Sequence, residues 1–225
     1  MINSKPTVDI VIAAYNAEQN IKRLLSSLVQ QREDGFMISN IVVHSDSSSD
    51  HTVELASSIQ DTRLRIINSK KRLGLANVVK KAIKKTKANY LNILNDDIVI
   101  ANDEFIINII KLFLKDKEIG LVSSNIIPFK GKTFTERSVV SGYNAFKRTA
   151  LELENGNNYL TSDGKSLTLS RKLIQKIILN IDQKTMGNVD LFLYLECIRV
   201  GMKFRLAKNS TIYFKCPSNA KDFVR

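Results

Sequence analysis

The segment YLNILNDDIV, from Tyr90 to Val99, joins an apolar run to two adjacent carboxylates. An apolar run of this kind is typical of a buried strand in an α/β domain, and ligands bind beyond the carboxyl ends of such strands. There, Asp96 and Asp97 would repel each other and lose water unless a cation or a polar partner compensated. A hard divalent cation is the natural compensation, because it also binds phosphate oxygens. A polar loop or a helix cap explains the two residues equally well, so the surrounding segments must decide.

The chain before and after this segment alternates strand and helix patterns. We predict strands at 8–14, 41–43, 64–67 and 90–94. Each is followed by a helix whose apolar residues recur at helical spacing. Asn16 and Gln19 are spaced as in a capping box before the first of these helices. The order predicts an α/β fold with a mostly parallel central sheet flanked by helices.

The second half of the sequence is less regular. A further strand is predicted at 119–123, and a loop-dominated region rich in Gly, Ser, Thr, Lys and Asn at 125–158. The remaining elements are predicted as a strand at 167–169, helices at 171–178 and 190–200, and closing strands at 203–206 and 211–214. The whole chain, 1–225, is interpreted as a single domain with two functional halves.

Composition narrows the class of protein. With 44% hydrophobic residues and three prolines among 225 residues, the chain is not expected to be disordered. It has no apolar stretch of membrane-spanning length and no N-terminal signal peptide, and Cys197 and Cys216 are too few for a disulfide scaffold. An intracellular, reducing setting is therefore expected. The net charge of +12 favours anionic partners: nucleic acid, nucleotide diphosphates or an acidic membrane surface.

Four lysines on the third predicted helix contribute to this charge: Lys80, Lys81, Lys84 and Lys85. They lie opposite the apolar face of the helix, so the simplest interpretation is a solvated outer face. A nucleic-acid surface would be expected to show aromatic or Arg-rich interleaving in a recognisable module, and none is evident. We therefore predict no nucleic-acid partner. Contact with anionic lipid headgroups is the functional alternative.

Five segments resemble, in order, the motifs of one enzyme family. They are IAAYNAEQNI (12–21), VHSDSSSDHT (43–52), RLGLA (72–76), LNDD (94–97), and DLFLYL with VGMK (190–195 and 200–203). Together they resemble the nucleotide-sugar-dependent inverting glycosyltransferases of the GT-A fold, the large family 2 grouping. The resemblance spans nearly the whole chain, although Ala13 replaces the family's Pro and Ser47 its Gly. It implies a GT-A domain in which 1–124 binds the nucleotide-sugar and 125–225 the acceptor.

The resemblance implies a metal–diphosphate site around Asp97. Asn95 occupies the first acidic position of the family's D-x-D motif, so Asp97 is expected to hold the metal, Mg²⁺ or Mn²⁺, with support from Asp96. The cation would stabilise the charge that grows on the diphosphate leaving group. Arg72 is expected to meet diphosphate oxygens, and Gly74 to allow close approach.

The resemblance also implies a cleft for the nucleotide. Asp46, after the second strand, is expected to recognise the base or ribose. Tyr15 and Glu18 would line the same cleft, with the backbone of Ala13 and Ala14 approaching the base. In contrast, Asn16 and Asp50 are interpreted as helix caps.

The catalytic base is predicted to be Asp190. An inverting transfer needs a carboxylate that takes the proton of the acceptor hydroxyl. The family commonly has E-D-x-[DE]-L at this place, and in that register the chain has GNVDL (187–191), which lacks the usual acids. Asp190 matches the second acid of another form of the motif. The alternatives are that Asp190 is a first-turn acid favoured by the helix dipole and that Asn188 is a cap.

The C-terminal segment 215–225 resembles the stretch that precedes the [QR]-x-x-R-W motif of membrane-embedded family members. We therefore expect a catalytic fragment or short form that works on a lipid-linked or polymeric glycan. Its expected location is cytoplasmic and peripheral, at the inner face of the cell membrane, and a free cytoplasmic enzyme is the alternative.

Other classes stay open at this point. A catalytically weak or inactive nucleotide-sugar-binding domain would keep Asp46 and Asp97 but lack a base. A nucleotidyltransferase would be expected to carry a Gly-rich, basic first loop, which does not follow Val11 and Ile12.

Overall fold

The N-terminal half alternates strands with helices in the predicted order, and residues 5–183 and 186–217 are described in a computed structural model of the protein. Its elements are β1 (Thr7–Ala14), α1 (Ile21–Val29), β2 (Met37–Ser45), α2 (Thr52–Ser57), β3 (Leu64–Asn68), α3 (Leu75–Lys85), β4 (Tyr90–Asn95), β5 (Ile98–Ile100) and α4 (Phe105–Lys115). The short β5 is the one element of this half that the sequence did not predict.

The C-terminal half adds three strands and further helices. They are β6 (Ile119–Pro128), α5 (Phe134–Glu152), η1 (Leu153–Gly156), η2 (Tyr159–Thr161), β7 (Ser166–Ser170), α6 (Arg171–Ile177), η3 (Ile178–Gln183), α7 (Val189–Arg199) and β8 (Lys203–Phe214). No helix in the described ranges has the length and apolarity required to cross a bilayer.

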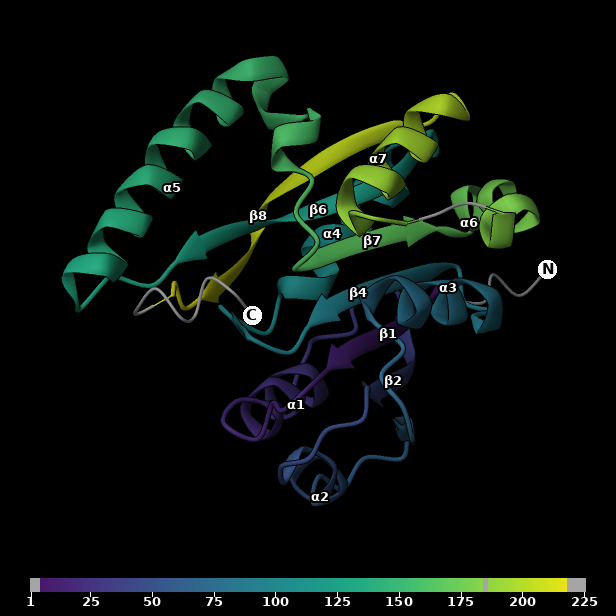
Figure 1. The fold of residues 1–225 in the computed structure, drawn as a ribbon. Coiled ribbons are helices and arrows are strands. Elements are labelled where there is room, and N and C mark those ends of the chain that lie inside the picture. The colour runs from purple at the N-terminus through teal and green to yellow at the C-terminus, as the bar shows by residue number, and fades with distance from the viewer. Residues whose placement is uncertain (1–4, 184–185, 218–225) are drawn as a thin grey trace.

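The strands form one sheet in the order β3-β2-β1-β4-β7-β6-β8-β5, with helices on both faces (Figure 1). Four of the seven pairings are parallel, which are β1–β2, β1–β4, β2–β3 and β6–β8. The predicted single-domain α/β fold with a mostly parallel sheet is therefore confirmed. Both predicted halves build this sheet, because β5 pairs with β8; their division into donor and acceptor halves stays a prediction.

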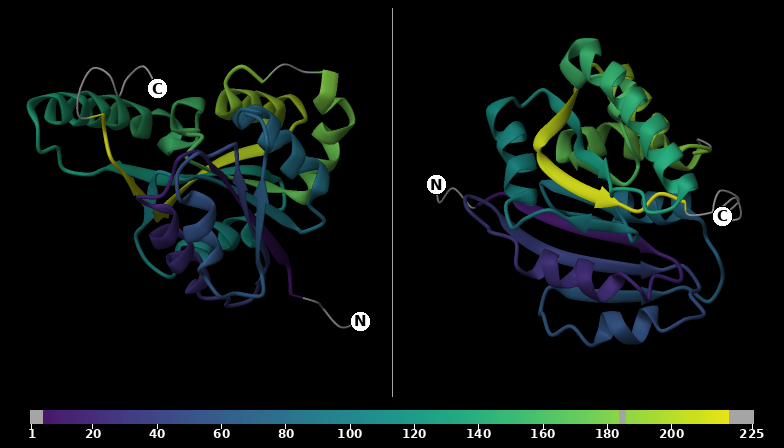
Figure 2. Two further views of the ribbon diagram at one scale, coloured as in Figure 1. Left: turned by 60° about the horizontal axis from the view of Figure 1, so that its bottom comes forward. Right: turned by 90° about the vertical axis from the view of Figure 1, so that its left-hand side faces the viewer.

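Each face of the sheet has its own hydrophobic core (Figure 2). One core packs under α1, α2 and α4, and the other under α3, α6 and α7. In α1 the side chains of Ile21, Leu24, Leu25 and Leu28 are fully buried, whereas the N-cap Asn20 makes no capping hydrogen bond. Since each such side chain contributes about 2 kcal/mol on burial, packing rather than capping holds this helix.

The prediction of a loop-dominated region at 125–158 is wrong, because this region contains the 19-residue helix α5. The helix begins with a capping box: Glu136 N–H donates to the Thr133 hydroxyl, and the Glu136 carboxylate accepts from Thr133 N–H. Only Glu136 and Ala150 are buried in α5, and the helix stands out at one side of the molecule (Figure 1). A mostly exposed helix needs no strong apolar stripe, so its periodicity is weak in the sequence.

Two smaller predictions also need correction. The two closing strands are one strand, β8, whose register shifts opposite Ser124 and Asn125 and so bulges between Ala207 and Thr211. The Asn16 capping box does not form. Asn16 instead adopts a positive φ of 51°, and its side chain accepts a hydrogen bond from Ser49 N–H.

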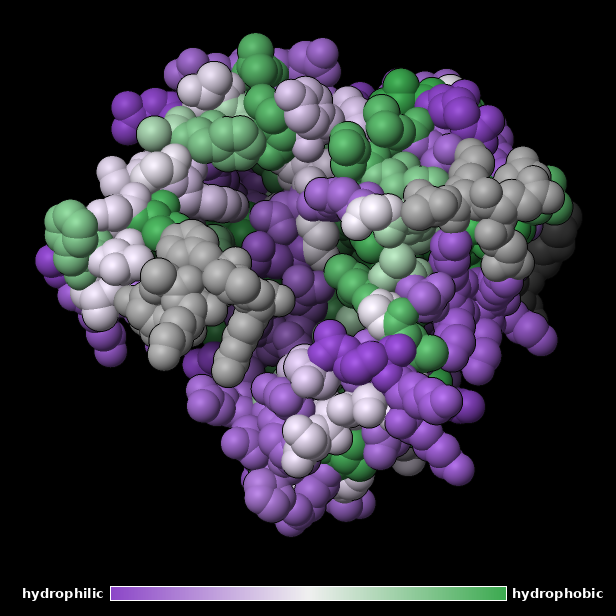
Figure 3. All heavy atoms as spheres, in the orientation of Figure 1, coloured by the Kyte–Doolittle hydropathy of each residue, from purple (hydrophilic) through white to green (hydrophobic). Residues whose placement is uncertain are grey.

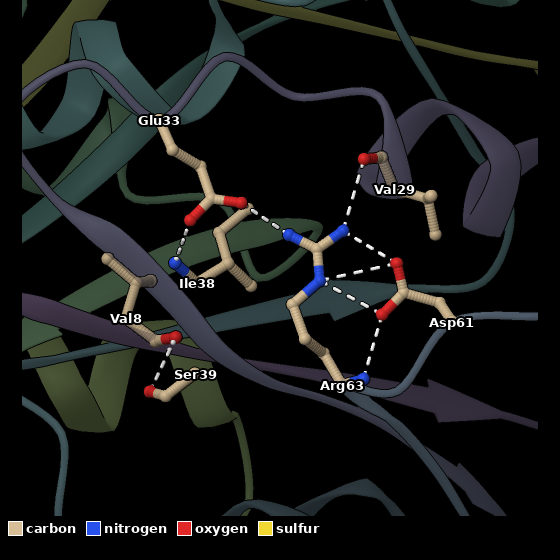
Figure 4. A network of polar contacts seen from close by, with 7 residues as sticks. All are labelled: Val8, Val29, Glu33, Ile38, Ser39, Asp61 and Arg63. Atoms are coloured by element: carbon tan, nitrogen blue, oxygen red, sulfur yellow. Dashed lines mark hydrogen bonds and ion pairs between the residues drawn. The ribbon is translucent and has the colours of Figure 1, made fainter.

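The connection between α1 and β3 is held by an Arg63 network (Figure 4). The Arg63 guanidinium pairs with Asp61 at 2.6 Å and with Glu33, and donates to the Val29 carbonyl at 3.1 Å. Glu33 also accepts from Ile38 N–H at 2.7 Å, so one cluster joins the end of α1 to β2 and to β3.

Arg63→Ala is expected to lower the free energy of unfolding by about 2 kcal/mol, because it leaves Asp61 and Glu33 without their shared partner. In the folded protein the Arg63 hydrogen bond lowers the pKa of Asp61. This contribution is present above the ordinary pKa of an aspartate and is lost as the pH falls through the lowered value. Urea unfolding between pH 7 and 3 should therefore show that the free energy of unfolding falls less steeply with decreasing pH in the variant than in the parent protein. Arg32→Ala, which removes exposed ion pairs, is the control and should have a smaller effect.

Candidate functional site

The site lies at the edge of the sheet where β1, β2 and β4 end. Ala14 is opposite Ser45 on β2, and Ala13 is opposite Asn95 on β4, so these strands end in register. Asp46 N–H donates to the Ala14 carbonyl at 2.8 Å and extends the β1–β2 pairing by one residue. Side chains that follow the three strands are thereby brought together.

Asp46 is buried and holds the turn before α3. Its Oδ1 accepts from Leu73 N–H at 2.7 Å, its Oδ2 accepts from Gly74 N–H at 2.9 Å, and Arg72 Nε lies 3.4 Å from Oδ2. Gly74 has a φ of 79°, a conformation that strains residues with a Cβ. Asp46 therefore determines where Arg72 and the first turn of α3 lie.

Tyr15 and Arg72 form an exposed pair over this edge. Tyr15 is 45% exposed, and the Arg72 guanidinium carbon lies 3.4 Å from the centroid of its ring. The Tyr15 backbone N–H donates to Asp96 Oδ2 at 2.7 Å. Burial raises the pKa of Asp96, the Tyr15 hydrogen bond lowers it and the Asp97 charge raises it, with a net value of about 6. Asp96 thus joins the end of β4 to the end of β1.

Asp97 faces a lysine and a second carboxylate that the sequence analysis did not identify. Burial raises the pKa of Asp97, the positive charge of Lys165 opposes this, and the negative charge of Asp163 adds to it. Lys165 Nζ lies 3.6 Å from Asp163 Oδ1 and 4.6 Å from the centroid of the Phe214 ring. The Asp-Gly dipeptide at 163–164 is a turn signal, but it gave no indication of this proximity.

Asp190 lies in the first turn of α7 and lines a cleft of about 470 Å³. The cleft is bounded by the first turn of α3, the end of β4, the 163–165 turn and the start of α7. Asp190 Oδ2 accepts from Gly164 N–H at 3.1 Å, and Oδ1 from Leu191 N–H at 2.9 Å. Figure 3 shows a hollow lined largely by hydrophilic residues between α5 and the α7 region.

Of the two residues considered as caps near the site, Asn188 caps its helix, whereas Asp50 precedes His51, which is the N-cap residue of α2. Asn188 is the N-cap of α7, and its side chain accepts from Leu191 N–H at 3.1 Å. Asp50 Oδ1 accepts from Thr52 N–H at the start of α2, and its Oδ2 accepts from Glu18 N–H. The Glu18 carboxylate in turn accepts from His51 N–H at 3.1 Å, so Glu18 joins the loop after β1 to the start of α2.

The family model described as Glycosyl transferase family 2 matches residues 9–178 of the chain. The chain belongs to this family. The match begins in β1 and extends into η3, so it contains Asp46, Asp97 and the Asp163–Lys165 turn.

Two curated relatives carry consistent names. A Haemophilus influenzae protein named "Uncharacterized glycosyltransferase" is 36% identical over 74 residues, which are 32% of this chain and 22% of that protein. The hyaluronan synthase of Pasteurella multocida is 30% identical over 122 residues, 54% of this chain and 12% of the synthase. The matches thus cover about a fifth or less of these relatives.

Solved structures support the fold of this family 2 domain. The Pyrobaculum calidifontis mannosyltransferase PcManGT, solved with GDP-Man and Mn²⁺, has a TM-score of 0.68 at 18% identity, covering 97% of this chain and 59% of that one. S. aureus TarS 1–349 has a TM-score of 0.69 at 16% identity, covering 96% and 62%. The chain therefore spans about three fifths of the length of these structures.

Asp46→Asn is expected to weaken nucleotide binding to this family 2 domain about tenfold. An amide has a single accepting oxygen, so one of the Leu73 and Gly74 N–H groups loses its partner and the turn that carries Arg72 loosens. Nucleotide titration by calorimetry measures the change. Asp34→Asn, at the exposed ion pair with Arg32, should leave the affinity unchanged. Equal affinities in all three proteins would contradict the role of Asp46.

Proposed function

We propose that this domain transfers a sugar from a nucleotide-diphospho-sugar to an acceptor hydroxyl, with inversion at the anomeric carbon and with the help of a divalent cation. The supporting observation is that Asp46, Asp96 and Asp97, at the ends of β2 and β4, share one edge of the sheet with the cleft that Asp190 lines. A nucleotide and a reacting sugar need both a binding edge and an adjacent base.

The donor would bind across the ends of β1 and β2. The exposed Tyr15 ring offers a stacking surface, and Arg72 above it carries a charge suited to a diphosphate. The backbone of Ala13 and Ala14, together with Asp46 and Glu18, would border the same cleft. Gly74 lines the neighbouring cleft, where its missing side chain leaves room beside the start of α3.

Asp97 would hold the cation, with Asp96 in support. In the described ranges no group of three or more His, Cys, Asp or Glu side chains could bind a metal by themselves. A single carboxylate fits Mg²⁺ or Mn²⁺ nevertheless, because such ions are commonly held by one or two carboxylates and by the phosphates of the substrate. The bound ion would act as a Lewis acid toward the diphosphate leaving group. Lys165, which interacts electrostatically with Asp97, would add positive charge on the same side.

Asp190 is the proposed base. Its carboxylate would take the proton of the acceptor hydroxyl while the acceptor oxygen bonds to the anomeric carbon. The bond from that carbon to the diphosphate oxygen breaks, and its electron pair leaves with the diphosphate. Asp190 lies in the first turn of α7, where it lines the cleft together with Gly164 and Lys165.

The acceptor is proposed to be a lipid-linked or polymeric glycan that reaches the cleft lined by Asp190. The net charge of +12 supports work close to an anionic membrane surface. The C-terminal segment that suggested this location falls mostly on 218–225 and so lies outside the described residues.

A catalytically weak nucleotide-sugar-binding domain is the second candidate. Both oxygens of Asp190 already accept backbone hydrogen bonds, from Gly164 and from Leu191, so each already has a protein partner. Such a domain would bind the donor without transferring the sugar.

Titration with nucleoside diphosphates, with and without Mn²⁺, tests the donor site, and a screen of donor sugars for hydrolysis tests the chemistry. Cation-dependent binding of one nucleoside diphosphate together with hydrolysis of its sugar conjugate is the expected result. Binding without turnover of any donor would favour the second candidate. Preference for a polynucleotide over every nucleoside diphosphate would overturn both.

A further inference from the structure

A second cavity, of about 500 Å³, lies on the α3 side of the sheet. It shares no lining residue with the cleft that contains Asp190. Residues from β1, β2, β3, β4 and α3 surround it. A volume of this size is within the range of small-molecule sites, which extends from about 300 to 1,000 Å³.

The cavity exists because α3 covers only part of this face. The helix packs against β1 and β4, whereas β3 is the edge strand and β2 lies next to it (Figure 1). Side chains on this face of β2 and β3 are therefore not covered by the helix, which leaves a space beside α3. Val11, Val42 and Leu91, with Val78 and Ala82 of α3, give the cavity an apolar wall.

Buried polar side chains complete the wall, among them Asp9 and His44. Asp9 is satisfied, since it accepts from Ser39, Asn40 and Thr86 at 2.7–3.0 Å. His44 is 3% exposed, and its Nε2 lies 2.8 Å from the Ser69 hydroxyl. Burial lowers the pKa of His44, the charges of Lys81 and Lys85 lower it further, and Asp46 opposes them. His44 is therefore expected to be neutral at pH 7.

The rim of the cavity is cationic. Arg65 projects from the edge strand, where it is opposite Val42, and Lys81 and Lys85 project from α3. These three cations exceed the single carboxylate of Asp9 by two charges. Although most of α3's lysine-rich surface faces solvent, as the sequence predicts, two of its lysines border an apolar space.

We propose that this cavity binds an amphipathic anion, in which a phosphate or carboxylate headgroup lies between Arg65, Lys81 and Lys85 and an apolar body lies against Val11, Val42 and Leu91. The cations of the rim recognise the charged headgroup, and burial of the apolar body against the apolar wall supplies further binding free energy. The ligand could be a dissolved amphiphile or a membrane lipid, which share this chemistry.

The two histidines of the chain allow a direct test with n-octyl phosphate as the probe. His44 lines the cavity, whereas His51 is exposed and pairs with Glu54 at 2.9 Å. In NMR titrations we expect saturable shifts of the His44 imidazole signals and a rise in its pKa, because the bound anion offsets the charges of Lys81 and Lys85. The His51 signals should stay unchanged. Inorganic phosphate and n-octyl glucoside, which each lack one half of the probe, should bind at least tenfold more weakly.

Two matched double variants test whether the lysines of α3 bind the headgroup. Lys81→Glu/Lys85→Glu should weaken octyl phosphate binding at least tenfold, while Lys111→Glu/Lys115→Glu, with the same spacing and exposure on α4, should not. Absence of a saturable His44 shift, equal binding of octyl glucoside or of phosphate, or equal binding by both variants would overturn the proposal. Asp97→Asn should bind octyl phosphate normally, so failure of the proposed sugar transfer is distinguishable from failure of this site.

Vesicles separate the two sources of the ligand. Flotation with phosphatidic acid vesicles that is lost in Lys81→Glu/Lys85→Glu, and retained in the α4 control, assigns a membrane lipid. Binding of octyl phosphate without such flotation assigns a dissolved amphiphile. Both results agree with an amphipathic anion in the cavity.

Discussion

Asp97→Asn is expected to lower the rate of sugar transfer about a thousandfold. The amide has the shape of the carboxylate but not its charge, so the cation would lose its protein ligand and the diphosphate its counter-charge. Asp96 Oδ2 already accepts from the Tyr15 N–H, so Asp96 is less suited than Asp97 to hold the cation. Initial rates with a donor found in the hydrolysis screen, at several Mn²⁺ concentrations, measure the loss.

The control for this variant is Asp103→Asn, at an exposed position shortly after β5. It should keep the rate and the cation dependence. Nucleoside diphosphate binding gives a second readout, since Asp97→Asn should bind equally with and without Mn²⁺. If the variant kept both the rate and the stimulation by Mn²⁺, the assignment of Asp97 to the cation would be wrong.

Asp190→Asn is expected to lower kcat by a hundredfold to about ten-thousandfold, which is the usual contribution of a general base. The donor affinity should change little, because Asp190 lies at the start of α7 and not at the ends of β1 and β2. Asn retains an accepting oxygen for Gly164 N–H, so the 163–165 turn should keep its place. Donor binding by calorimetry and single-turnover transfer rates separate the two effects.

Asp163→Asn is the informative comparison, because Asp163 lines the same cleft and pairs with Lys165. We expect this variant to lose less activity than Asp190→Asn and to weaken the cation dependence, through Lys165 and Asp97. A larger loss of kcat in Asp163→Asn than in Asp190→Asn would transfer the role of base to Asp163. Full activity in both variants would exclude either carboxylate as the base.

Local patterns predicted the first half of the fold well, and for a physical reason. The strands at β1 and β4 are apolar runs, and the inner face of α3 repeats at helical spacing, so burial and periodicity coincide there. The prediction failed at α5, where little of the helix is buried and the capping box at Thr133 carries the signal instead. It also failed for the bulge in β8, since a shift in register depends on the partner strand.

In the candidate site, too, the sequence suggested some residues and missed others. The resemblance to the family's motifs suggested Asp46, Asp97 and Asp190 as site residues, because each follows or precedes a recognisable element. It gave no sign of Asp163 and Lys165, whose proximity to Asp97 depends on the antiparallel pairing of β7 with β4.

The strand–helix alternation of the first half, the α/β class and the acidic residues at the strand ends follow from the sequence, because these depend on periodicity and on residues close in the chain. The contacts of those residues depend on how distant parts of the chain pack together. Asp46 bonds the turn at Leu73 and Gly74, and Asp96 bonds Tyr15 across 81 positions of sequence. The cavity beside α3 is likewise a tertiary feature, because it arises where one helix is too narrow to cover four strands. Long-range contacts of this kind depend on register and packing, which no local pattern encodes.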